Sequence, residues 1–205
     1  MDWQLAAPEV RVLGALLEKE ITTPEYYPLS LNALVNACNQ KSNREPVVSY
    51  DEATVEEALS GLRAKGLAVR ITGESRVPKH AQRFTEKLNL GRREAALLCV
   101  LMLRGPQTTG ELRGRSERLY AFDDLESVES TLNRLTEQGM AKKLPRSAGS
   151  REPRWAHLLS GDVESFEEAP PVIAHGPSGE ERIAALERDI AELRREFEEF
   201  RARFE

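Results

Sequence analysis

The sequence predicts a helix-rich α+β fold in which one small unit is repeated, followed by a separate C-terminal amphipathic helix. Three observations support this prediction. A helix–glycine–strand pattern occurs twice, the helices before it recur in the same order, and apolar residues near the C-terminus follow heptad spacing. At 205 residues, the chain is long enough for two small domains and additional segments.

The third helix of each unit carries the clearest repeat. The segments "VEEALSGLRAKGLA" (55–68) and "VESTLNRLTEQGMA" (128–141) share Val, Glu, two Leu, Gly and Ala at a constant offset of 73 residues. Each segment predicts an amphipathic helix that ends at a left-handed glycine and is followed by a strand. The starts of the two helices are predicted by pairs with capping-box spacing, Ser49 with Glu52 and Asp123 with Glu126.

The two preceding helices of each unit also correspond. "EVRVLGALLE" from Glu9 and "EAALLCVLML" from Glu94 both predict an apolar helix. "SLNAL" from Ser30 and "TTGEL" from Thr108 both predict the N-capped start of a second helix. The repeat therefore extends over three helices and not only one.

Each third helix is followed by a predicted β-hairpin. Alternation over residues 67–71 and the segment "GESRVPKHAQRF" form the first hairpin, and "MAKKL" and "RWAHLL" form the second. Three helices followed by a two-stranded hairpin is the plan of a winged helix. We therefore predict two tandem winged-helix domains, each with its own core. Chance similarity between amphipathic helices is the alternative.

The predicted boundaries follow from this repeat. The first winged-helix domain covers residues 1–88 and the second covers residues 89–160. Residues 161–179 are rich in Pro, Gly and acidic residues and predict a flexible acidic linker. Residues 180–205 contain neither Pro nor Gly and predict a helix.

The block "ITTPEYYPLSLNALVNACNQKSNREPVVS", together with "ALSGLRAKGL" and "SRVPKHAQRF", resembles the YceH-like family of uncharacterised bacterial proteins. The resemblance covers roughly residues 8–159. It implies two consecutive winged-helix domains and brings no established activity.

The C-terminal helix carries a heptad seam, which predicts coiled-coil pairing. The alternatives are self-association of two chains, which would make a homo-oligomer, and docking on a domain of the same chain. The seam consists of Ile183, Leu186, Ile190, Leu193, Phe197, Phe200 and Phe204.

Composition predicts a bacterial cytoplasmic protein. The chain is 40% hydrophobic and 31% charged, and "MDWQLAAPEV" has neither the basic start nor the apolar core of a signal peptide. No apolar run approaches the roughly 18 residues that a membrane span needs. Cys38 and Cys99 fall in apolar helical patterns, so we expect buried thiols and not a disulfide.

Enzymatic motifs are not found in the sequence. His80, His157 and His175 are far apart, and no spacing suits zinc, a phosphate loop or a catalytic nucleophile. We expect a non-enzymatic protein with no cofactor and no metal.

The charge distribution leaves two functions open. The net charge of −5 combines −1 over residues 1–88, +3 over 89–160 and −7 over 161–205. The third helices begin with "SYDEATVEEA" and "FDDLESVES", whose carboxylates oppose docking in the DNA major groove.

Basic residues elsewhere predict weak DNA binding or regulation, mainly through the hairpin tips. The alternative is a protein–protein adaptor that resembles the tandem winged-helix subunits of bacterial chromosome-organising complexes. The basic candidates are Lys142, Lys143, Arg146, Arg151 and Arg154 in the second hairpin, Arg113, Arg115 and Arg118 around the short helix, and Lys41 and Arg44.

A row of asparagines in the first unit has three interpretations. Asn32, Asn36, Asn39 and Asn43 recur at four, three and four residues, so on a helix they form one stripe. Their amides could hold the following connection by hydrogen bonds to its backbone, line a protein interface, or touch nucleic acid together with Lys41 and Arg44. The loop-organising role is the preferred prediction.

Overall fold

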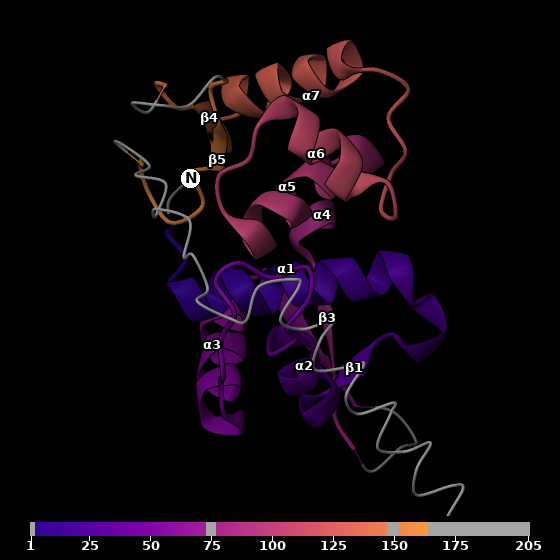
Figure 1. Cartoon of the computed structure of the whole chain (residues 1–205). Helices are drawn as coiled ribbons and strands as arrows, with labels where there is room; N and C mark the ends of the chain where they lie inside the picture. Colours follow the sequence, from indigo (N-terminus) through magenta and orange to yellow (C-terminus); the bar gives the residue numbers. More distant parts are fainter. Residues whose placement is uncertain (1–2, 73–76, 147–151, 164–205) are drawn as a thin grey trace, which may run out of the picture. The chain divides into compact units, whose positions relative to one another are not determined.

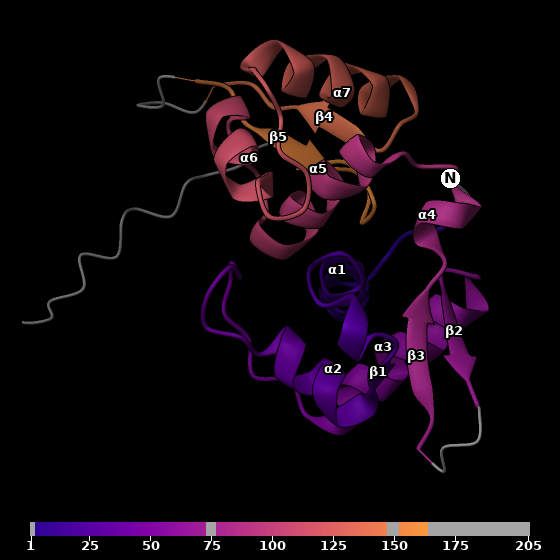
Figure 2. The same cartoon turned by 90° about the vertical axis from the view of Figure 1, so that its right-hand side faces the viewer.

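The computed structural model describes residues 3–72, 77–146 and 152–163 (Figures 1 and 2). About half of these residues are helical, and the strands form two small antiparallel sheets. Arg151, most of the predicted linker and the predicted C-terminal helix with its seam from Ile183 to Phe204 lie outside the described residues. The predictions for them stay predictions.

The first half of the described chain contains a three-stranded sheet with β3 in its centre. β3 pairs antiparallel with β2 on one side and with β1 on the other, where Leu29 lies opposite His80. In order, the elements are α1 (Ala7–Thr22), a 3₁₀ turn η1 (Pro24–Tyr26), β1 (Leu29–Ser30), α2 (Leu31–Cys38), α3 (Glu52–Ala64), β2 (Ala68–Ile71), β3 (Lys79–Gln82) and the short helix α4 (Phe84–Lys87).

The second half repeats the order of three helices and a hairpin. Its elements are α5 (Arg92–Arg104), α6 (Thr109–Ser116), α7 (Leu125–Glu137), β4 (Ala141–Lys143) and β5 (Trp155–His157). Just before α6, Gln107 bridges to Trp155 of the hairpin, as Leu29 pairs with β3 just before α2. Gly66 and Gly139 adopt φ of +68° and +69°, so the predicted left-handed glycines and the paired strands after them are confirmed.

The N-caps of α3 and α7 differ from the prediction. The helices begin at Glu52 and Leu125. The side chains of Asp51 and Asp124 accept hydrogen bonds from backbone N–H groups three residues later, at 2.8 and 2.7 Å. The capping pairs that start at Ser49 and Asp123 are therefore wrong. An aspartate one or two residues further on is an equally good cap, and capping-box spacing alone does not distinguish them.

A single hydrophobic core runs through both halves, and α1 and α5 form its centre. In both views α1 lies between α2 and α3 on one side and α5 on the other (Figures 1 and 2). The runs Glu9–Leu17 of α1 and Glu94–Leu103 of α5 are buried without a break. At Gly14 the helices are so close that a Cβ atom would lie 2.9 Å from Leu103 Cδ2.

This continuous core corrects the expectation that each unit buries a core of its own. A helix that is buried on all faces must pack against other elements on more than one side. Each of the helices α1 and α5 covers one side of the other. The domain boundaries at residues 88 and 160 stay a prediction. Over residues 3–72, 77–146 and 152–163, no helix combines the length and hydropathy needed to cross a membrane.

Candidate functional site

Most of the connection between α2 and α3, residues 39–50, is irregular in path but tightly bonded, and we call it the α2–α3 loop. Asn39 joins its two ends: its Nδ2 donates to Tyr50 O and its Oδ1 accepts from Tyr50 N, both at 2.8 Å. The middle of the loop is held to α5, because Glu45 N donates to Leu103 O at 2.9 Å. The loop is therefore fixed at both ends and in the centre.

Arg44 is the buried centre of this loop, with a side chain that is 0% exposed. Its guanidinium forms a two-point ion pair with Glu18 of α1, at 3.1 and 2.6 Å. It also donates to Ala37 O at 3.2 and 2.9 Å, to Gln40 Oε1 at 3.1 Å and to Asn43 O at 2.9 Å. A buried charge requires such pairing because desolvation otherwise destabilises the fold.

The prediction that Arg44 contacts nucleic acid is therefore corrected. Its guanidinium is enclosed by the protein and bonded to four residues, so it has no free face for a phosphate. This role could not be predicted from the neighbouring residues, because the carboxylate partner of Arg44 lies 26 residues earlier in the chain.

Arg11 is a second buried guanidinium beside the loop, and it is not among the residues predicted from the sequence. It donates to Pro46 O at 2.5 Å and to Cys38 O at 3.4 Å. Burial, followed by the nearby charge of Arg44, lowers the pKa of Arg11 from its ordinary value. The one available signal was an arginine inside the apolar run of α1, where a buried charge must have a polar partner.

The four asparagines fall into two pairs. Asn32 and Asn36 are exposed on α2, and Asn36 Nδ2 donates to Asn32 Oδ1 at 3.1 Å. Asn39 and Asn43 belong to the loop, and Asn43 adopts a positive φ of 59° while its Oδ1 accepts from the Arg104 guanidinium of α5. Two of the four amides therefore bond the loop, and two bond each other at the surface.

Replacement of Asn39 by alanine is expected to lower the free energy of unfolding by about 1–3 kcal/mol, because the Tyr50 backbone loses both hydrogen-bond partners. Urea denaturation followed by circular dichroism measures the change. Asn36→Ala, one turn earlier and exposed, is the matched control and is expected to change stability by less than about 0.5 kcal/mol. Equal effects of the two variants would contradict the loop-fixing role of Asn39.

Two basic residues of the second hairpin are already paired with carboxylates. Lys142 Nζ lies 2.7 Å from Asp162 Oδ1. Arg154 Nη1 lies 2.7 Å from Glu111 Oε2, and it also donates to Pro106 O at 3.2 Å. Both cations would have to give up these contacts to meet a phosphate.

The remaining cations of the predicted set are more accessible. Lys143 and Arg146 are exposed at the end of β4, and the Lys143 ammonium lies 5.3 Å from the ring centre of Trp155. Lys41 is exposed on the α2–α3 loop. Arg113 is exposed as well, but it holds the connection before α7 by donating to the carbonyl oxygens of residues 122 and 123.

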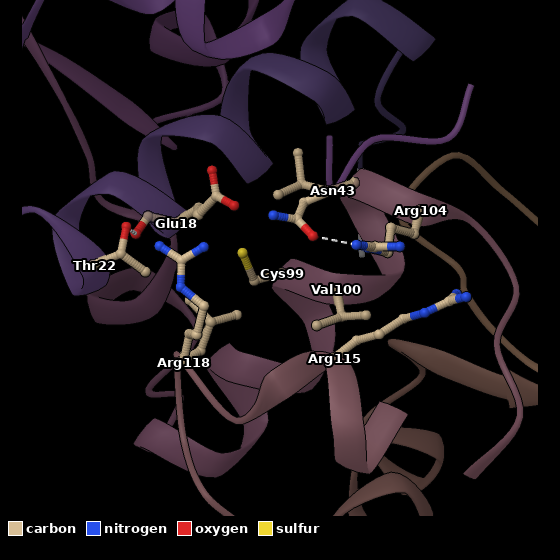
Figure 3. A pocket seen from close by; sticks show the side chains of 10 residues that line it. Glu18, Thr22, Asn43, Cys99, Val100, Arg104, Arg115 and Arg118 are labelled. Atoms are coloured by element: carbon tan, nitrogen blue, oxygen red, sulfur yellow. Dashed lines mark hydrogen bonds between the residues drawn. The ribbon is translucent and has the colours of Figure 1, made fainter. Parts of the chain in front are cut away.

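A small pocket of about 40 Å³ lies next to the α2–α3 loop, and we call it the arginine pocket (Figure 3). Its wall includes residues of α1, the loop, α5, α6 and the turn after α6. The lining residues are Glu18, Thr22, Asn43, Cys99, Val100, Leu103, Arg104, Arg115, Arg118 and Leu119. Of the basic residues predicted from the sequence, this pocket brings together Arg115 and Arg118, and it adds Arg104.

A second, larger groove of about 460 Å³ lies between the start of α1 and α3. The α3 residues Thr54, Glu57, Ser60 and Gly61 form one side of it. Glu9 lines the opposite side, where its carboxylate accepts from Lys65 Nζ at 2.5 Å and caps α1 through Ala6 N at 2.8 Å.

These features define a helix-rich protein with two small antiparallel sheets and a tightly bonded loop, and comparison with other proteins gives its family. Residues 5–150 match the family described as "Protein of unknown function, DUF480". The chain is 71% identical to a UPF0502 protein of Solibacter usitatus over the full length of both. It is 49% identical to a UPF0502 protein of Geobacter sulfurreducens, over 93% of this chain and 90% of that one.

The chain therefore belongs to the DUF480/UPF0502 family of uncharacterised bacterial proteins. The prediction of an uncharacterised bacterial family, made from the asparagine-rich block, is confirmed at this level.

Proposed function

We propose that the protein is a non-enzymatic adaptor, built from two winged-helix units in series, that binds a basic protein surface through its acidic third helices. The order of three helices and a hairpin in both halves supports the winged-helix assignment, as does the extra strand contact before α2 and α6. The observation that carries the adaptor function is the charge on the exposed faces of α3 and α7.

Exposed carboxylates occupy the first half of α3, and on α7 they lie in the first half and at the last residue. The basic residues of these helices lie in their last turns, and Arg134 of α7 is paired there with Glu94 at 3.2 Å. The exposed acidic residues are Asp51, Glu52, Glu56 and Glu57 at α3, and Asp124, Glu126, Glu129 and Glu137 at α7.

Two of these carboxylates, Asp51 and Asp124, are stabilised in their charged form by hydrogen bonds at the helix N-termini. Hydrogen bonds from Thr54 hold the pKa of Asp51 below its usual range, and those from Ser127 do the same for Asp124. A winged helix that reads DNA places this helix in the major groove, close to phosphates. Negative charge at that position opposes DNA and favours a basic protein partner.

The groove beside α3 adds a shape argument to the charge argument. The groove has a volume of about 460 Å³ and is lined by Glu57 and by Thr54 in the first turn of α3. A side chain of the partner could therefore enter the groove next to the acidic face. The likeness to tandem winged-helix subunits of chromosome-organising complexes is an analogy of fold and gives no partner identity.

Weak DNA binding through the second hairpin is the other candidate function. The observation that favours it is the exposure of Lys143 and Arg146 at the end of β4. Because Lys142 and Arg154 are paired with carboxylates, fewer cations support this function than the sequence alone indicated.

Charge reversal on α3 is expected to abolish capture of a protein partner. The triple variant Glu52→Lys, Glu56→Lys and Glu57→Lys changes exposed side chains only. Cross-linking in the native bacterium, followed by quantitative mass spectrometry, compares it with the unchanged chain. The captured partner is expected to fall at least about tenfold, since close charge pairs at interfaces contribute about 1.5 kcal/mol or more.

The matched control reverses three exposed carboxylates elsewhere, Glu25, Glu86 and Glu117, and is expected to retain the partner. Capture of the same proteins by all three chains would contradict the adaptor proposal. A fluorescence anisotropy titration with duplex DNA at low salt completes the test. Salt-dependent binding that weakens in the double variant Lys143→Gln and Arg146→Gln would favour the DNA function instead.

A further inference from the structure

We infer that the arginine pocket binds a small phosphate-type oxyanion, which Arg104, Arg115 and Arg118 hold. The inference does not depend on the adaptor proposal, because it uses a different surface. Arg104 ends α5, Arg115 lies in the last turn of α6, and Arg118 lies in the turn that follows. Figure 3 shows Arg118 on the side of Glu18 and Thr22, and Arg104 and Arg115 on the other side.

The acidic residue of the pocket does not neutralise these arginines. Glu18 is already paired with Arg44 at 2.6 Å and lies 3.7 Å from Lys19. The carboxylate nearest Arg115 is Glu111, at 3.3 Å, but Glu111 also pairs with Arg154 at 2.7 Å. The pocket therefore carries excess positive charge.

Within the described part of the chain, two of the three arginines form no ion pair with a carboxylate. Arg104 donates to the neutral amide oxygen of Asn43. Among the described residues Arg118 makes no hydrogen bond or ion pair, although it lines the pocket. Arginines at helix C-termini interact favourably with the helix dipole. This effect accounts for Arg104 and Arg115 on their own helices, but not for the presence of three arginines in the lining of one pocket.

Two of the arginines, Arg104 and Arg115, also repel each other. Burial is the main cause that lowers the pKa of Arg104, and the charge of Arg115 is the next. An oxyanion between them would offset this repulsion by accepting charge-assisted hydrogen bonds from both. Guanidinium groups commonly bind phosphate through such bonds.

The pocket supplies a neutral donor as well. Asn43 Oδ1 is used by Arg104, and its Nδ2 donates no hydrogen bond within the described part of the chain. Figure 3 shows this amide nitrogen on the side away from Arg104, facing the interior of the pocket. An amide N–H is a hydrogen-bond donor only, so the Asn43 amide nitrogen can bind an unprotonated oxygen of an oxyanion.

The size of the pocket limits the ligand. One water needs about 10–15 Å³ of such space, so a pocket of about 40 Å³ holds the oxygens of a single oxyanion group but not a nucleoside. Free phosphate and the phosphate group of a small monoester share this chemistry. In the second case the organic part would extend from the open side of the pocket.

Isothermal titration of the full chain tests the inference. Inorganic phosphate, glycerol phosphate and chloride are compared at equal ionic strength. We expect the two phosphates to bind and chloride not to bind. Arg118→Gln is expected to weaken phosphate binding at least about tenfold, because a hydrogen bond to a charged group contributes about 1.5–3 kcal/mol.

Arg118 is exposed, so its replacement leaves the fold intact. The matched control is Arg92→Gln, an exposed arginine at the opposite end of α5 from Arg104, which is expected to bind phosphate unchanged. Tighter binding of glycerol phosphate than of phosphate would identify a small monoester as the ligand, and the reverse order would identify free phosphate. Equal responses to phosphate and chloride, or equal losses in both variants, would overturn the inference.

Discussion

Replacement of Arg44 by alanine is expected to lower the free energy of unfolding by about 3–5 kcal/mol, because it leaves a buried carboxylate without its partner. Glu18, whose side chain is only 12% exposed, would lose both contacts of its ion pair. The carbonyl oxygens of Ala37 and Asn43 would lose a donor as well. Urea denaturation followed by circular dichroism measures the loss.

A control and a rescue accompany this variant. Lys41→Ala, three residues earlier and exposed, is expected to change stability by less than about 0.5 kcal/mol. The double variant Glu18→Gln and Arg44→Met is expected to recover part of the loss, because it removes both charges together. A loss below about 1 kcal/mol for Arg44→Ala would contradict its role as the centre of the loop.

Replacement of Leu59 by alanine is expected to destabilise both halves of the described chain together, by about 2–5 kcal/mol. Leu59 lies in α3 of the first half and is 0% exposed. Trp155 lies in β5 of the second half, and Trp3 is the other tryptophan of the chain. In a Trp3→Phe background, fluorescence therefore reports on the second half alone.

With one continuous core, the Trp155 fluorescence and circular dichroism are expected to show the same lowered denaturation midpoint. Ser60→Ala, the exposed neighbour on α3, is the control and is expected to leave the midpoint unchanged. The contrary result would be an unchanged denaturation midpoint for Trp155 fluorescence and an earlier loss of part of the helical circular dichroism signal. The two halves would then unfold independently, which would contradict the role of α1 and α5 in joining them into one core.

Features that depend on neighbouring residues could be predicted from the sequence. Gly66 and Gly139 end helices because only a residue without a side chain adopts positive φ at low cost. Ser30 caps α2 by accepting from Ala33 N at 3.3 Å, and the hairpin strands follow from the alternation of apolar and polar residues. In each case the cause and the effect lie within one element.

Features that depend on packing between distant elements could not be predicted. Cys99 Sγ lies 3.6 Å from Gly14 O across 85 residues, and this contact marks where α1 and α5 join the halves into one core. The apolar residues of α1 are compatible with burial of one face or of all faces, so the sequence alone does not predict packing against α5. For the same reason the sequence placed Arg44 at a surface, and it did not indicate that Arg104 and Arg118 line one pocket.

Cys38 and Cys99 sit deep in that shared core, without contact with solvent. Burial raises the pKa of Cys38 to about 12 and moves that of Cys99 upward as well, so neither forms the thiolate that reacts with alkylating reagents or oxidants. Alkylation must therefore wait until the core opens, and each modified molecule records one such opening. The rate of alkylation therefore reports how often the native core opens to solvent.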